Sequence, residues 1–186
     1  MFPFPLSGLG QSNERARRTG QCPSRASFAV TTEIVDIALW TRKRRALLPL
    51  FQLADDSPAQ IRSYLDQGEI LVARPEAPIG HVQLIAGSLP AEVEIRSLAV
   101  AEEHQRVGIG TRLMEAAAEH CKATGASRLT VSTAASSLAA LRFYLRRGFR
   151  VFSVVRDAFS PATGYGEGLK SDGLAVNDAL VLHLEI

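Results

Sequence analysis

The stretch that decides the fold reads Glu94-Ile95-Arg96-Ser97-Leu98-Ala99-Val100 and, four residues later, Gln105-Arg106-Val107-Gly108-Ile109-Gly110-Thr111. The first part is typical of a strand, and the second leads into an amphipathic helix predicted over residues 108–124. Gly108 and Gly110 let the backbone approach a ligand closely, and the unpaired N–H groups of the first helical turn favour an anion. A strand that delivers a glycine turn to a helix N-terminus therefore predicts a diphosphate site.

Two known nucleotide-binding motifs are close to this pattern, and neither fits it. A dinucleotide-binding turn has a third glycine three places after Gly110, where Leu113 stands, and it follows the first strand of a doubly wound sheet. A P-loop ends in Gly-Lys followed by Ser or Thr, which this segment lacks. The turn therefore indicates a diphosphate site of another kind.

Strand and helix patterns continue on both sides of this stretch. The strands predicted around it cover residues 28–36, 69–74, 79–86, 92–100, 128–133, 149–155 and 178–186. The other helices are predicted over residues 39–53, with an interruption near Pro49, and over residues 58–67 and 136–147, and a glycine-rich loop is predicted over residues 157–177. The early strands form an antiparallel meander and the later ones alternate with helices. The sequence therefore predicts a single α/β domain over residues 28–186.

Length and composition exclude several classes of protein. A chain of 186 residues that is 46% hydrophobic and 22% charged is long enough to build one core, and it is neither disordered, collagen-like nor disulfide-rich. No run approaches the roughly 18 apolar residues of a membrane span. A net charge of +2 argues against nucleic acid as a partner. Cys22 and Cys121 lack metal-ligand spacing, so we expect no metal site and a reduced, cytoplasmic setting.

The N-terminal segment and one basic run are expected to carry no chemistry. Residues 1–27 hold three Pro, three Gly and four Arg without a hydrophobic period, which predicts a disordered tail. An Arg-rich transit peptide is the alternative, although the segment has no amphipathic face. The run Arg42-Lys43-Arg44-Arg45 is interpreted as the solvated face of an amphipathic helix.

Two motifs in order carry a resemblance to a known family. They are Gln105-x-x-Gly108-x-Gly110 after a strand ending in Leu98-Ala99-Val100, and Phe143-Tyr144-x-x-x-Gly148-Phe149 downstream. Together they resemble the GNAT superfamily of acyl-CoA-dependent N-acetyltransferases, over residues 28–155. The resemblance implies a fold of the α+β type: a mixed, largely antiparallel central sheet with helices on both faces, splayed open by a bulge in the strand over residues 92–100. It also implies acetyl-CoA as the co-substrate.

The resemblance further implies which residues hold acetyl-CoA. The Leu98 main chain binds the thioester oxygen, the Val100 main chain pairs with the pantetheine arm, and the glycine turn binds the diphosphate. Many members begin the downstream helix with Asn where this chain has Ser137, which either hydrogen-bonds a pantetheine amide or caps the helix. The expected cofactor-binding residues are Leu98, Ala99, Val100, Gln105, Arg106, Val107, Gly108, Ile109, Gly110, Thr111 and Ser137.

Acetyl transfer to an amine needs a proton acceptor, because an amine with a pKa of about 10.4 is mostly protonated at pH 7. Glu94 stands where several members of the family carry a general base; the alternatives are an ion pair with Arg96 and, as the base, Glu92. Tyr144 is the expected proton donor to the departing thiolate, or else a core aromatic. Since Cys121 and the neighbouring His120 have no nucleophile partner in view, we expect direct transfer.

The last third of the chain is expected to shape the acceptor site. Residues 150–186 hold five acids against three bases, which favours a cationic amine, or else is a solvated loop. Phe159 and Tyr165 lie in the glycine-rich loop, which is expected to close over a small substrate. His81 is expected on a strand surface. The predicted acceptor is a small-molecule primary amine; the alternatives are a protein or peptide N-terminus and a non-catalytic acyl-CoA-binding module. A homodimer is implied by family analogy alone.

Overall fold

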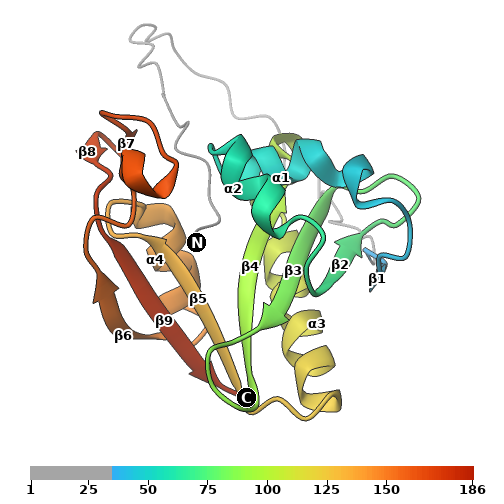
Figure 1. Cartoon of the computed structure of the whole chain (residues 1–186). Coiled ribbons are helices and arrows are strands. Elements are labelled where there is room, and N and C mark those ends of the chain that lie inside the picture. Colours follow the sequence, from blue (N-terminus) through green and yellow to red (C-terminus); the bar gives the residue numbers. More distant parts are fainter. Residues whose placement is uncertain (1–34) are drawn as a thin grey trace, which may run out of the picture.

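The computed structural model describes residues 35–186, which form a seven-stranded sheet flanked by helices (Figure 1). The strand order is β1-β2-β3-β4-β5-β9-β6. Within the described sheet, β4 and β5 are parallel and every other neighbouring pair is antiparallel. The predicted tail over residues 1–27, and most of the strand predicted over residues 28–36, lie outside the described residues.

From β2 onward the main elements follow the predicted order, whereas β1 lies just beyond the strand predicted over residues 28–36 and a small hairpin forms within the predicted loop. The strands of the sheet are β1 Ile37–Leu39, β2 Glu69–Ala73, β3 Gly80–Ala86, β4 Glu92–Val100, β5 Arg128–Ala134, β6 Arg150–Val155 and β9 Ala179–Glu185. The α-helices are α1 Leu48–Ala54, α2 Pro58–Tyr64, α3 Ile109–Ala123 and α4 Leu138–Leu145. Short 3₁₀ turns cover η1 Arg44–Leu47, η2 Glu102–His104 and η3 Pro161–Thr163, and a small hairpin pairs β7 Lys170–Ser171 with β8 Leu174–Ala175.

The first helical region is interrupted next to Pro49, as predicted, but it begins at Arg44 rather than at residue 39. The helix expected over residues 39–53 is divided into η1 and α1, and Pro49 lies in the first turn of α1. Proline fits there because its missing N–H would have no intrahelical partner at that position. The predicted cap of the next helix is confirmed, since the Ser57 hydroxyl accepts a hydrogen bond from the Gln60 N–H at 3.3 Å.

The basic run is only partly solvated. The Arg42 guanidinium pairs with Glu76 at 2.9 Å on the surface, as expected of an exposed residue. The guanidinium of Arg44 instead donates to the main-chain carbonyls of Leu65, Gln67 and Gly68, where α2 ends. A cation at this position satisfies carbonyls that the helix leaves unpaired. Arg44 therefore fixes the end of α2 rather than forming part of a solvated face.

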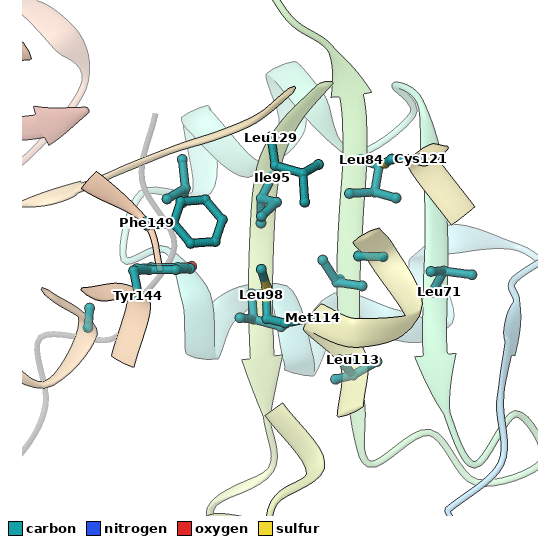
Figure 2. Packing of buried hydrophobic residues seen from close by; sticks show 14 of the residues in the cluster. Leu71, Leu84, Ile95, Leu98, Leu113, Met114, Cys121, Leu129, Tyr144 and Phe149 are labelled. Carbon is teal, nitrogen blue, oxygen red and sulfur yellow. The ribbon is translucent and has the colours of Figure 1, made fainter. Parts of the chain in front are cut away.

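Two apolar layers cover the two faces of the sheet (Figure 1). In β2, Leu71 and Ala73 pack with α3, whereas Ile70 and Val72 pack with α1 and α2. This alternation follows from the two-residue period of a strand. Figure 2 shows the larger layer, in which α3 and α4 meet the sheet. No helix within residues 35–186 is long and apolar enough to cross a membrane.

The sheet opens at a bulge in β4. Ser97 pairs with Gln83 and Ile95 with Leu84, so Arg96 is the extra residue of β4. The pairing of β4 with β5 ends at Ile95 and Val131, and the two strands diverge beyond that point (Figure 1). The expected mixed sheet, splayed at a bulged strand and covered by helices on both faces, is therefore confirmed.

Candidate active site

The glycine turn lies where β4 passes into α3. The N-cap of α3 is Gly108, with φ of 92°, and no side chain caps the helix. A side chain at this φ is strained, so glycine is needed to make the turn. The first-turn N–H groups of α3 are left as donors for an anion, next to the exposed residues Gln105, Arg106 and Val107. These residues fit a diphosphate.

A second glycine sets the distance between α3 and α4. A Cβ added to Gly110 would lie 3.3 Å from the ring of Phe143 and 3.8 Å from Val100. The Arg147 guanidinium also packs on that ring, with its central carbon 3.4 Å from the ring centroid. Gly110 therefore allows the start of α3 to lie directly against Phe143.

Arg147 is a functional candidate that the sequence reasoning missed. Its guanidinium donates to the Phe143 carbonyl at 2.7 Å and to the hydroxyl of Thr111 in the first turn of α3. Burial lowers the pKa of Arg147, and the negative charge of Glu115 partly offsets that effect. A cation beside the positive end of a helix dipole is placed to meet an anion. Gly148 after it marks a helix end in the sequence, but nothing local indicates the contact with Thr111.

The main chain of Val100 has a partner within the chain. The side-chain amide of Gln105 donates to the Val100 carbonyl at 2.9 Å. This bond ties the glycine turn to the end of β4, so Gln105 positions the turn. Leu98 and Ala99 are buried in the diverging part of β4, and Ile109 packs into the core below the turn.

Ser137 lies at the N-cap of α4, but its hydroxyl does not cap the helix. The N–H of Leu138 in the first turn instead donates to the carboxylate of Asp172, from the β7–β8 hairpin, at 3.0 Å. Of the two predicted roles for Ser137, capping is therefore wrong. Ser137 is buried on the same side of α4 as Ala140 and Tyr144, as the spacing of the three residues predicts.

Tyr144 is fully buried and directed from α4 toward β4 (Figure 2). Its ring packs edge-on against Phe143 and Phe149, with centroids 5.2 and 5.4 Å apart. Burial raises the pKa of Tyr144 well above its usual value, and Arg147 lowers it slightly. The phenol therefore stays protonated at any physiological pH and is available only as a donor. Tyr144 is therefore a core aromatic residue, and its role as a proton donor stays a prediction.

Glu94 and Arg96 lie on either side of the last β4–β5 pair. The Arg96 guanidinium lies 3.4 Å from the Glu94 carboxylate, so the predicted ion pair is present. The other carboxylate of the strand, Glu92, accepts from the Ser88 N–H at 3.0 Å and lies 4.0 Å from Arg128, at the end of β4 remote from the opening. Glu94 is therefore the better placed of the two carboxylates.

The strand histidine is not on a surface, contrary to the prediction. His81 is completely buried, and burial lowers its pKa to about 3, so it is a neutral side chain. Its Nε2 lies 2.8 Å from the Ser97 hydroxyl, and its ring lies 4.4 Å from Phe51. The interpretation failed because β3 is an interior strand, with α1 covering the face to which His81 points.

Cys121 is also buried, and burial raises its pKa to about 11. The neighbouring His120 is engaged with Glu69, with 2.8 Å between Nε2 and the carboxylate. A thiol with a raised pKa is a poor nucleophile near neutral pH. Both features favour direct transfer over a cysteine intermediate.

Several acids of the last third have structural partners. Asp172 binds the start of α4, Asp178 accepts from the Asp157 N–H at 3.0 Å, and Glu185 pairs with Arg128 at 2.7 Å. These contacts weaken the interpretation of residues 150–186 as an acidic rim. Phe159 and Tyr165 do come together, with ring centroids 5.0 Å apart, in a small buried cluster of the loop.

A group of buried polar residues on the α1–α2 face was also missed. Asp55, in the turn between α1 and α2, is 3% exposed and accepts from the Ser57 N–H at 2.9 Å. The Tyr64 hydroxyl donates to the same carboxylate at 3.3 Å, and the Arg96 guanidinium lies 4.3 Å from the Tyr64 ring centroid. Asp55 precedes a Ser-Pro helix start, where an exposed turn residue is the usual expectation.

Comparisons with known proteins agree with this arrangement. Residues 36–149 match the Acetyltransferase (GNAT) family. The chain is 31% identical over 140 residues to an uncharacterised N-acetyltransferase of Bacillus subtilis, YvbK, covering 75% of this chain and 89% of that protein.

Solved structures are similar over most of the chain. An IAA acetyltransferase from Bacillus cereus is 34% identical with a TM-score of 0.72, covering 81% of this chain and 100% of that one. A GNAT acetyltransferase from Elizabethkingia anophelis, solved with acetyl-CoA bound, is 28% identical with a TM-score of 0.75, covering 83% and 99%. With its splayed sheet and glycine turn, this chain belongs to the GNAT family of acetyltransferases.

Proposed function

We propose that this protein transfers an acetyl group from acetyl-CoA directly to the primary amine of a small molecule. The observation that carries the proposal is the opening of the sheet at the β4 bulge, with the uncapped start of α3 at its mouth. Leu98 to Val100 offer main chain to the pantetheine arm, and residues 105–111 offer N–H groups to the diphosphate. The acetyl-CoA bound to the Elizabethkingia relative supports the choice of co-substrate.

Glu94 and Tyr144 are the proposed catalytic residues. Glu94 takes a proton from the acceptor's ammonium group, directly or through a water, and the resulting amine attacks the thioester. The C–N bond forms and the C–S bond breaks, the Tyr144 hydroxyl gives its proton to the departing thiolate, and the proton lost by the new amide nitrogen restores the phenol. Preorganised donors aimed at a developing charge typically lower a barrier by ~3 kcal/mol each. Ser137 is proposed to hydrogen-bond a pantetheine amide.

A small acceptor is favoured over a peptide by the loop between β6 and β9. The Ser57 hydroxyl donates to the Gly164 carbonyl at 2.8 Å, and the Gln60 amide donates to the Thr163 carbonyl at 2.5 Å. These bonds join the loop to α2 on the face where the acceptor must arrive. A loop closed in this way leaves less room for an extended chain than an open groove does.

We also propose that two copies pair through β6. This strand is the edge of the sheet, and all six of its residues are exposed. Val151, Phe152, Val154 and Val155 make it an apolar edge, with Phe152 66% exposed. Exposed apolar edges of this kind are typically covered by another chain.

Calorimetry with coenzyme A, followed by thiol release from acetyl-CoA against a panel of aliphatic amines, tests the proposal. We expect binding of coenzyme A, and release that depends on the amine. Binding without release by any amine would favour the non-catalytic module instead, and acetylation confined to peptide N-termini would overturn the small-molecule acceptor. If coenzyme A does not bind, the proposed function as a whole is wrong.

A further inference from the structure

Four buried side chains and the half-buried Glu94 form one group on the acceptor face, which we call the acceptor-side cluster: Asp55, Tyr64, Glu94, Arg96 and Tyr165. They come from the α1–α2 turn, the end of α2, the bulge of β4 and the β6–β9 loop. Figure 1 shows α2 and this loop at the same end of the sheet, where β4 and β5 diverge. The cluster therefore lies beside the opening through which the acceptor is proposed to reach the acetyl group.

The cluster has one net negative charge when both of its carboxyl groups are ionised, because Arg96 is its one cation and its two tyrosines are neutral. The guanidinium of Arg96 lies 3.4 Å from the Glu94 carboxylate, and its positive charge also lowers the pKa of Asp55. Among residues 35–186, Arg96 is the cation that acts on Asp55. Burial raises the pKa of Asp55, more than the Ser57 N–H, the Tyr64 hydroxyl and Arg96 together lower it. A carboxylate buried in this way is stabilised by a further cation.

Tyr165 follows Gly164, whose carbonyl accepts a hydrogen bond from Ser57, two residues after Asp55. Tyr165 is 6% exposed, and its buried hydroxyl has no hydrogen-bond partner among the described residues. Burial, and then the negative charge of Asp55, raise the pKa of Tyr165, so the phenol is neutral. A neutral hydroxyl stabilises a buried carboxylate less than an ammonium group does, because a hydrogen bond between two charged groups is the stronger one.

We propose that Asp55 binds the ammonium group of the acceptor, and that the Tyr165 hydroxyl occupies this position until the acceptor arrives. The proposal rests on the proposed function and assigns the substrate class: aliphatic amines, which are cations at pH 7, rather than neutral arylamines. The three N–H groups of an ammonium allow contact with Asp55 while Glu94 takes one proton. Asp55 is thus an acceptor-binding residue, and Glu94 remains the proton acceptor.

Direct binding tests the subsite without requiring turnover. The 2-phenylethylammonium ion and aniline, a charged and a neutral amine that share a phenyl ring, are titrated by calorimetry into protein saturated with coenzyme A at pH 7. We expect the ammonium ion to bind at least tenfold more tightly than aniline. Asp55→Asn should weaken binding of the 2-phenylethylammonium ion at least tenfold and change the affinity for aniline by less than twofold. The matched control is Asp56→Asn, at the exposed neighbour, which should behave like the parent.

A second variant gives an effect of opposite sign. Tyr165→Phe removes the competing hydroxyl, so we expect 2-phenylethylammonium to bind two- to fivefold more tightly. If amines are also acetylated, Asp55→Asn should act mainly on KM and Glu94→Gln mainly on kcat. Equal affinities of the parent for the two probes, an unchanged affinity in Asp55→Asn, or weaker binding in Tyr165→Phe would each overturn the assignment. Cation binding that depends on Asp55, without acetylation of any amine, would uphold the subsite and reject the proposed function.

Discussion

At the residue scale, the clearest distinction is between Glu94 as a base and Glu94 as half of an ion pair. The 3.4 Å contact with Arg96 shows that the pair exists, and a carboxylate in a pair can still accept a proton from a bound ammonium. Measurements of stability and of turnover separate the two roles, because loss of an ion pair lowers stability whereas loss of a base lowers turnover.

Glu94→Gln is expected to lower turnover by about 10²- to 10⁴-fold, the usual contribution of a general base. The loss should be largest at low pH, where more of the acceptor is protonated and needs a base. Initial rates of thiol release between pH 6 and 9 measure it, with Glu92→Gln as the control at the remote end of β4. A variant that loses thermal stability while keeping parent rates across this range would leave Glu94 a structural role only.

Tyr144→Phe is expected to lower kcat by about 10- to 100-fold while the affinity for coenzyme A stays the same. The ring fills the same space between Phe143 and Phe149, so packing is retained and only the donor is lost. Because burial raises the pKa of Tyr144, the phenol does not ionise below pH 10, and its effect should be independent of pH. Single-turnover thiol release checks this, and an unchanged rate would leave Tyr144 as a core aromatic alone.

At the element scale, the contact between α3 and α4 shapes the proposed diphosphate site. Gly110 brings the start of α3 against Phe143, and Arg147, just beyond α4, bonds to Thr111 in the first turn of α3. One helix supplies main-chain donors, and the segment after the other supplies a cation. The site therefore depends on the packing of two helices as well as on the glycine motif.

Arg147→Gln is expected to weaken binding of coenzyme A about tenfold, because a charge-assisted contact to the diphosphate is lost. The affinity for dephospho-coenzyme A, which keeps the diphosphate, should fall by the same factor when measured by calorimetry. A loss confined to coenzyme A would place Arg147 at the 3′-phosphate instead. The companion variant Arg147→Lys keeps the charge but not the flat contact with Phe143, and it should retain part of the affinity.

At the scale of the whole molecule, the two edges of the sheet differ. The described β1 edge is a strand of three residues, whereas the β6 edge is six residues long and apolar. Long apolar edges favour association with another chain, and short ones do not.

Phe152→Asp is expected to convert a dimer into a monomer, since it places a charge in the proposed contact between two β6 strands. Light scattering after gel filtration gives the mass of each form, and calorimetry with coenzyme A shows whether the fold is intact. If the parent protein is a monomer at high micromolar concentration, pairing through β6 is excluded.

The sequence by itself determined the order of elements, the bounds of β4, the diphosphate turn and the expectation of an opened sheet. These are local matters: residue period, glycine conformation and helix termini are set by neighbours a few positions apart. Ser57 at the start of α2 and Gly108 at the start of α3 could be recognised for that reason.

Only the tertiary structure decided which polar side chains are buried and what they meet. Asp55 lies in a turn that local rules place in solvent, yet it is buried, and a loop more than 100 residues later in the chain is bonded beside it to Ser57 and Gln60. His81 and Arg147 were misread or missed for the same reason, since their partners lie on other elements. Burial and charge pairing are sums over neighbours in space, and the spacing of residues along the chain does not contain them.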